Sequence, residues 1–226
     1  MNCMYCRHSH CHKRGQRNGK QRYQCLNCRR FFQDDYTYRA YNQEANKWIT
    51  RLLKNSCGVL DISRILEIAP KTVLSRMLKI SKTVRSQSDI PRQCEFEIDE
   101  MSIKIGNGQK QNWLIYGIEK QTKQIISFKI GRRTKKNIKQ IMDKILALEP
   151  KKVFTDRLNI YPKLIPKEIH KRFPYCTNKI ERMNLTLRTH IKRLSRKTIC
   201  FSRKRKYLEA HLKIYFWADN NLSPTL

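Results

Sequence analysis

Residues 94–131 read CEFEIDEMSIKIGNGQKQNWLIYGIEKQTKQIISFKIG, and they decide the fold of the larger part of the chain. CEFEIDEMSIKI alternates, with Phe96 and Ile98 on one face and Glu97 and Asp99 on the other, which is typical of a β-strand. NGQK predicts a turn, NWLIYGIE is apolar on both faces and predicts a buried central strand, and IISFKIG predicts a third strand after a turn at KQTKQ. The stretch therefore predicts three consecutive strands of one sheet.

Helical and strand patterns follow these strands. NIKQIMDKILALEP has apolar residues at helical steps and stops at Pro150, and KKVFTD predicts a short strand that ends in Asp156. Residues 157–176 are mixed and Pro-rich and carry no clear pattern. A basic helix is expected next, and a last helix over about 203–217. The apolar stripe of the basic helix consists of Ile180, Met183, Leu187, Ile191 and Leu194. This order predicts an α/β domain with a mixed sheet over residues 94–226.

The preceding residues, 40–88, predict helices throughout. GVLDISRILEI and APKTVLSRMLKI are two short helical patterns with a tight junction before Pro70, a residue that suits the first turn of a helix. Two helices joined this closely fit a helix-turn-helix, although an ordinary helical hairpin has the same pattern. The polar SQSDIPRQ, residues 86–93, predicts a linker. The DNA-contacting candidates on the second helix are Lys71, Thr72, Ser75 and Arg76.

Two cysteine pairs mark residues 1–35. Cys3-x-x-Cys6 and Cys25-x-x-Cys28 can each place two thiolates on one tetrahedral ion, and NGKQRYQC between them predicts a turn that enters a strand, as in a zinc ribbon. A module this small needs the ion for its folding energy. Four further residues could replace one of the ligands, and these are His8, His10, Cys11 and His12.

Composition indicates the class of partner. The chain has 226 residues and a formal net charge of +31, which predicts a polyanion as partner, with nucleic acid ahead of an anionic membrane. No apolar run of membrane-spanning length exists and the N-terminus is no signal peptide, so we expect an intracellular protein. The cysteine count is odd, at nine, and this also favours metal binding in a reducing compartment over a disulfide scaffold.

Three carboxylates suggest a metal-dependent active site. Asp99 ends the first alternating pattern, Asp156 ends the fourth strand, and Glu181 lies in the first turn of the basic helix. If they converge, their repulsion favours two hard divalent cations, Mg²⁺ or Mn²⁺, which can drive phosphodiester cleavage and transfer. Other roles are open: Asp99 fits a solvated strand residue, Asp156 fits the start of a turn, and Asn178-x-x-Glu181 has the spacing of a capping box.

A strongly basic segment follows Glu181. Residues 182–206 contain ten Lys or Arg and no Asp or Glu, a composition suited to tracking a nucleic-acid backbone in a salt-dependent manner. The candidates for DNA contact in this segment are Arg182, Lys192, Arg193, Arg196 and Lys197.

The ribbon, GVLDISRILEIAPKTV, TDRLNIY and above all NKIERMNLTLRTHIKRLSRKTICF resemble the transposases of the insertion-sequence-one family over nearly the whole chain. The resemblance implies a ribonuclease-H-like domain with an Asp-Asp-Glu site formed by Asp99, Asp156 and Glu181, and a basic residue two turns after the glutamate, here Arg188. It implies cleavage at the terminal inverted repeats of a mobile element, joining of the freed 3′ ends to target DNA, and a homo-oligomer on DNA in the prokaryotic cytoplasm, at the nucleoid.

The prediction is therefore a multi-domain α+β enzyme with a zinc ribbon (1–35), a helix-turn-helix module (40–88) and a ribonuclease-H-like α/β domain (94–226). Two other functions are open. A regulator built from the same ribbon and helices would bind DNA without cleaving it. A tyrosine recombinase would use Tyr207 or Tyr215 as nucleophile beside Arg188, His190 and Arg193, but both tyrosines lie on an apolar stripe.

Overall fold

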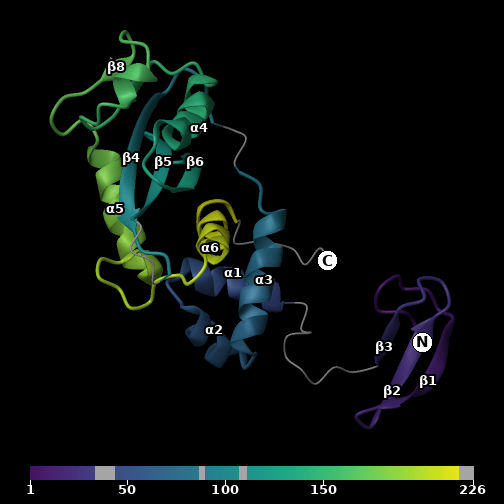
Figure 1. Cartoon of the computed structure of the whole chain (residues 1–226). Helices are drawn as coiled ribbons and strands as arrows, with labels where there is room; N and C mark the ends of the chain where they lie inside the picture. Colours follow the sequence, from purple (N-terminus) through teal and green to yellow (C-terminus); the bar gives the residue numbers. More distant parts are fainter. Residues whose placement is uncertain (34–43, 87–89, 107–110, 219–226) are drawn as a thin grey trace. The chain divides into compact units, whose positions relative to one another are not determined.

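The computed structural model describes residues 1–33, 44–86, 90–106 and 111–218, and it forms two compact units, residues 1–45 and 46–226 (Figure 1). Three predictions concern residues outside this description: the NGQK turn, the middle of the 86–93 linker, and the ends of the ribbon and helical modules that meet near residue 40. The helical module predicted as a separate part shares its compact unit with the α/β part.

The first unit is a three-stranded antiparallel sheet in the order β1-β2-β3. Asn18 and Gly19 both have positive φ, 54° and 72°, and they form the tight hairpin turn that Asn-Gly favours. The strand predicted after this turn is β2; β1 and β3 were not predicted. The core consists of Cys3, Cys25 and Phe32, which is too small to stabilise the unit alone. The strands are β1 (Cys11–Arg17), β2 (Lys20–Cys25) and β3 (Phe31–Gln33).

The second unit is built on a five-stranded mixed sheet in the order β6-β5-β4-β7-β8. The first three strands pair antiparallel, and β7 and β8 add in parallel on the other side of β4. The three predicted strands and the short strand after the helix are confirmed, whereas β8 comes from the stretch without a clear pattern. The strands are β4 (Glu95–Ile103), β5 (Asn112–Glu119), β6 (Ile125–Gly131), β7 (Lys152–Phe154) and β8 (His170–Lys171).

Helices cover both faces of this sheet. Phe96 and Ile98 pack with α4 (Lys135–Leu146) on one face, while Met101 and Ile103 pack with α5 (Asn178–His190) and α6 (Arg205–Trp217) on the other. Side chains alternate between the two faces along β4, so even-numbered and odd-numbered residues pack against different helices. The basic helix is shorter than predicted, because Ile191 is extended and Lys192–Leu194 is a separate 3₁₀ turn, although Ile191 and Leu194 remain buried.

The remaining helices pack against α6. They are α1 (Ala45–Lys54), α2 (Val59–Leu66) and α3 (Pro70–Thr83). As predicted, Pro70 opens α3, and the junction from α2 turns through Glu67 at φ 50°. Ile65 of α2 is 56% exposed, whereas Ile68 in the junction is buried. No helix within the described ranges has both the length and the apolar character to cross a bilayer.

Polar contacts join α1 and α2 to the sheet-bearing part. The ring Nε2 of His211 on α6 donates to the carbonyl of Leu53 at 3.3 Å, and Lys54 Nζ donates to the carbonyl of Ala218 at 2.7 Å. Lys192 forms an ion pair with Asp61 at 3.6 Å. These contacts, with the packing of α3 on α6, explain why the helical module belongs to the second compact unit.

We expect His211 to make stability fall in acid. Burial, reinforced by the charge of Arg193, lowers the pKa of His211 from 6.5 to about 4. Between these values the unfolded chain binds a proton that the folded chain does not, so stability present above pH 6.5 is lost as pH falls through 4. The contribution is about 3 kcal/mol. Urea unfolding at pH 7, 5.5 and 4 should show this loss in wild type and a smaller one in His211→Gln.

The control is His190→Gln, which replaces an exposed histidine of α5. It should keep the acid loss of wild type. An acid loss in His211→Gln equal to that of wild type would contradict the assignment.

Candidate functional site

The sequence pattern predicted Asp99 at the end of the first strand. In the structure Asp99 lies in the middle of β4. The strand continues to Ile103, but its parallel partner β7 pairs only with residues 95–97. Beyond Glu97 the β7 side of β4 therefore has no neighbouring strand in the described sheet. The short partner, and not the end of β4, leaves room for other groups beside Asp99.

The structure brings Asp156 to Asp99. Asp156 follows β7 by two residues, and because β7 runs parallel to β4, the chain leaving β7 passes the middle of β4. The backbone N–H of Leu158 donates to Asp156 Oδ1 at 2.9 Å and orients the carboxylate. One ligand oxygen from each of Asp99, Glu100 and Asp156 lies within 4.8 Å of the others.

Glu100 is a member of this group that was missed as a site residue. Its side chain is 8% exposed, Tyr161 donates to Oε1 at 2.5 Å, and Oε2 has no hydrogen-bond partner among the described groups. Burial, with the charges of Asp156 and Asp99, raises the pKa of Glu100 to about 7. One feature could have indicated it: an acidic residue at a strand position whose alternation predicts burial.

Glu181 lies in the first turn of α5, exposed, and outside that close group. Burial raises the pKa of Asp99, and the charges of Asp156 and Glu181 raise it further. The capping box with Asn178 is not formed, because the N-cap is Thr177 and Asn178 is already helical. The hydroxyl of Thr177 instead donates to Glu181 Oε1 at 2.9 Å.

Asn184 links α5 to Asp99. Its Nδ2 donates to Asp99 Oδ2 at 2.6 Å, and the buried Tyr116 of β5 donates to Asn184 Oδ1 at 2.8 Å. Asn184 lies three residues after Glu181 on α5 and was not among the predicted site residues. That spacing puts both side chains on one side of α5.

Arg188 lies one turn after Asn184. Its Nε contacts Met101 Sδ at 3.1 Å, and burial lowers its pKa while the charge of Asp99 acts in the opposite direction. Arg188 also lines a hollow of about 400 Å³ that is strongly basic. The other charged or hydroxyl side chains around it are Ser102, Lys104, Ser195, Arg196, Lys197 and Thr198.

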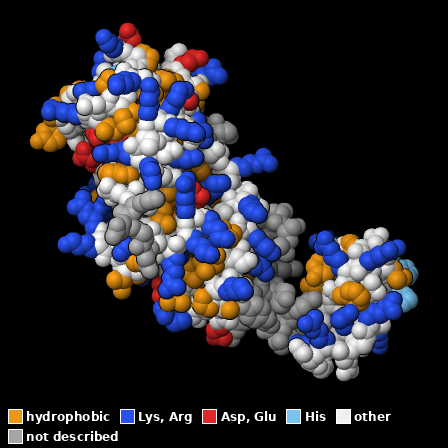
Figure 2. Space-filling view, in the orientation of Figure 1, with side chains coloured by type: hydrophobic (Ala, Val, Ile, Leu, Met, Phe, Trp, Pro, Cys, Tyr) orange, Lys and Arg blue, Asp and Glu red, His pale blue; other side chains and the backbone are white. Residues whose placement is uncertain are grey.

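The predicted DNA-contacting residues differ in exposure. Figure 2 shows Lys and Arg side chains spread over the visible face of each unit. Arg193 is half-buried and donates to Ser202 Oγ at 2.8 Å, and Arg76 donates to Asn46 Oδ1 at 3.3 Å, so both side chains are held by the protein. Thr72 is half-buried. The exposed members are Lys71, Ser75, Arg182, Lys192, Arg196 and Lys197.

The four paired cysteines converge in the first unit. The Sγ atoms of Cys3 and Cys28 are 3.7 Å apart, and those of Cys6 and Cys25 are 3.5 Å apart. A tetrahedral zinc ion with Zn–S bonds of 2.3 Å requires sulfurs about 3.8 Å apart. The four Sγ atoms lie within 4.8 Å of one another, so the donor set fits a structural zinc ion.

The neighbouring residues stay outside this group of four. Cys11 Sγ contacts the carbonyl of His8 at 3.8 Å, and none of the three nearby histidines joins the group. A hydrogen bond from the Cys28 backbone lowers the pKa of Cys25 to about 6, whereas burial and hydrogen bonds with the other three thiols raise the pKa of Cys28 to about 11.

Tyr207 and Tyr215, the two tyrosines considered as nucleophiles, are both half-buried. Tyr215 packs edge-on against Phe216, its hydroxyl lies 2.7 Å from His190 Nδ1, and burial raises its pKa. A raised pKa makes the phenolate nucleophile harder to form. The surroundings of Tyr215 therefore favour a role in packing over a role as nucleophile.

Known proteins resemble this chain in sequence. A family model described as IS1 transposase matches residues 93–217. The iso-IS1n protein InsB of Shigella dysenteriae is 36% identical over 118 residues, which cover 52% of this chain and 88% of the relative. The IS1 9 protein InsB of Escherichia coli K12 is 29% identical over 154 residues, which cover 68% and 85%.

Among solved structures, a chain of the simian T-cell lymphotropic virus intasome in complex with the PP2A regulatory subunit B56 gamma is 16% identical and aligns with a TM-score of 0.35. The alignment covers 62% of this chain and 59% of the other, a likeness too slight to support a conclusion. The family model, in contrast, covers more than half of the chain and includes Asp99, Glu100, Asp156 and Glu181. The chain therefore belongs to the IS1 transposase family.

Proposed function

We propose that this transposase cuts DNA at the ends of its insertion element and joins the freed 3′ ends to target DNA, with Mg²⁺ or Mn²⁺ as cofactor. The observation that carries the proposal is the meeting of Asp99, in mid-β4, with Asp156, beyond β7, within 4.8 Å. Asp99 comes from β4 and Asp156 from the segment that follows β7, and the charge of Glu181 on α5 acts on the same Asp99.

The residues present fit divalent cations. The carboxyl groups of Asp99, Glu100 and Asp156, whose ligand oxygens lie within 4.8 Å of one another, repel unless protons or cations lie between them. One buried oxygen of Glu100 has no partner among the described atoms. All the donors are hard oxygens, which Mg²⁺ and Mn²⁺ prefer. Asp99, Asp156 and Glu181 would hold the ions. Two bound ions would activate the attacking oxygen and stabilise the departing one.

The chain's own residues would orient the reactants. Asn184, held by Tyr116, fixes one oxygen of Asp99, so the carboxylate keeps one orientation. Arg188 and the basic hollow beside it would hold a DNA phosphate next to the acidic group. The exposed Arg182, Lys192, Arg196 and Lys197 would follow the backbone, and affinity for DNA would fall steeply with salt.

The amino-terminal parts would recognise the element. We propose that the ribbon binds one zinc ion through Cys3, Cys6, Cys25 and Cys28, and that α2 and α3 form a helix-turn-helix that reads the terminal inverted repeat. Lys71, Thr72, Ser75 and Arg76 lie in the first half of α3, the part that enters the major groove in such motifs. Because an element has two ends, we propose a homo-oligomer on DNA, acting at the prokaryotic nucleoid.

Replacing the carboxylates should abolish chemistry and spare DNA binding. We expect Asp99→Ala, Asp156→Ala and Glu181→Ala each to lower the rate of Mg²⁺-dependent cleavage of element-end DNA by about 100-fold or more, because each would remove a metal ligand. Gel-shift affinity for the same DNA should not fall.

The matched control is Asp143→Ala, which removes an acidic residue of α4 that is ion-paired with Lys139 on the surface. It should cleave like wild type. Unchanged cleavage in an active-site variant would remove that residue from the site, absence of cleavage in wild type would favour the regulator, and a covalent protein–DNA adduct would favour the tyrosine mechanism.

Removing one ribbon cysteine should release zinc. We expect wild type to retain one zinc ion per chain after dialysis, measured by elemental analysis, and Cys25→Ser to retain almost none and to bind element-end DNA more weakly, because zinc supplies the folding energy of this unit. Cys11→Ser, a change beside the site but outside the four ligands, should keep the zinc. Equal zinc in both variants would contradict the ligand set.

A further inference from the structure

The helix that carries Glu181 is aligned with β4 by three contacts at regular spacing. Glu97 Oε2 accepts from the Ile180 backbone N–H at 2.7 Å, Asp99 accepts from Asn184 at 2.6 Å, and Met101 contacts Arg188 at 3.1 Å. Each step is two residues on β4 and four on α5. Figure 1 shows α5 running beside β4.

This spacing matches the geometry of the two elements. Two residues of a strand span about 6.7 Å, and four residues of an α-helix span about 6 Å. The odd-numbered residues of β4 all point to the α5 face, because side chains alternate along a strand. A helix lying along β4 can therefore keep all three contacts together only in one register.

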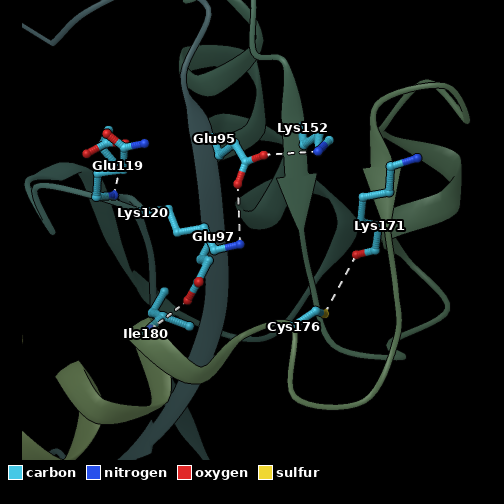
Figure 3. A network of polar contacts seen from close by, with 9 residues as sticks. Glu95, Glu97, Glu119, Lys120, Lys152, Lys171, Cys176 and Ile180 are labelled. Carbon is cyan, nitrogen blue, oxygen red and sulfur yellow. Dashed lines mark hydrogen bonds and ion pairs between the residues drawn. The ribbon is translucent and has the colours of Figure 1, made fainter.

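Glu97 makes the first of these contacts, and it does so as an N-cap supplied from another element. The hydroxyl of the true N-cap residue, Thr177, donates to Glu181 and caps no backbone group. The first N–H groups of a helix have no partner within the helix. Glu97, which is fully buried, takes that place by accepting from Ile180, as Figure 3 shows.

The contact between Glu97 and α5 carries a cost in stability. Glu97 Oε1 is buried and has no partner among the described groups, and an unsatisfied buried polar atom costs about 1–3 kcal/mol. Glu119 is a useful contrast at 2% exposure, because its two oxygens accept bonds from the turn at Gln121 and Thr122.

Cys176, in the turn before α5, makes two further contacts that hold the start of the helix. Cys176 Sγ donates to the carbonyl of Thr155 at 3.4 Å. It also contacts the carbonyl of Lys171 at 3.8 Å, the contact drawn in Figure 3. Thr155 immediately precedes Asp156. The start of α5 is thus held between β4, which carries Asp99, and the segment after β7, which carries Asp156.

We propose that Glu97 is a positioning residue of the active site: by capping α5 from β4 it sets the register of the helix, and with it the distance from Glu181 to Asp99. This inference rests on the proposed metal-dependent function. Glu97 itself need not touch DNA or metal. It acts through Ile180, the residue next to Glu181.

The test uses the full chain, with Mn²⁺ affinity measured by electron paramagnetic resonance and kcat and KM measured for cleavage of element-end DNA. Glu97→Leu removes the acceptor, and Glu97→Asp keeps the charge but shortens its reach. We expect both to weaken Mn²⁺ binding about tenfold or more and to lower kcat while KM for DNA stays the same. Glu97→Gln keeps an acceptor oxygen and should stay within about threefold of wild type.

Glu119→Leu is the matched control, because it removes another buried glutamate that accepts backbone hydrogen bonds, but from a turn that does not belong to α5. It should lower the melting temperature and leave Mn²⁺ affinity unchanged. An equal loss of affinity in Glu119→Leu would overturn the proposal, as would wild-type values in Glu97→Leu and Glu97→Asp. A loss in Glu97→Gln as large as in Glu97→Leu would also overturn it, since charge and not position would carry the effect.

The outcome separates this inference from the function on which it rests. A wild-type chain that neither binds Mn²⁺ nor cleaves DNA would end the proposed function. A wild-type chain that does both, with Glu97 variants that match it, would end only the role of Glu97.

Discussion

The short parallel pairing of β7 with β4 is the constraint on which the rest of the second unit depends. Three register pairs, from Glu95 with Lys152 to Glu97 with Phe154, fix the direction and position of the chain that leaves β7. Glu95 reinforces the pairing, because its two oxygens form ion pairs with Lys152 and with Lys120 (Figure 3). Because the pairing stops at Glu97, Asp156 meets Asp99 where β4 has no strand on that side.

The same strand carries acidic side chains to two different environments. Glu97 and Asp99 face α5, where one accepts a backbone N–H and the other accepts from Asn184. Glu100 is bonded to Tyr161 in the loop that follows β7. In a chain with a net charge of +31, these carboxyl groups are gathered on one strand and are buried or half-buried.

Local patterns in the sequence predicted most of the elements but not their contacts. Alternation in CEFEIDEMSIKI placed Phe96 and Ile98 on one face of the sheet, and helical spacing found α4 and α6, because these signals depend on neighbours in the sequence. The cysteine pairs predicted the group of four sulfurs for the same reason. Asp99 in mid-strand, β8 and the partners of Glu100 depend on the register between strands far apart in the chain, which no local pattern contains.

The packing of α3 on α6 has a mechanical consequence. α6 also contacts β6 of the sheet, so α3 is connected to the sheet through a packed helix and not through the polar segment near residue 88 alone. If α3 holds DNA as proposed, the span from the bases it reads to the bond that is cut is a property of the folded protein. The protein would then cleave DNA at a fixed distance from the sequence that α3 recognises.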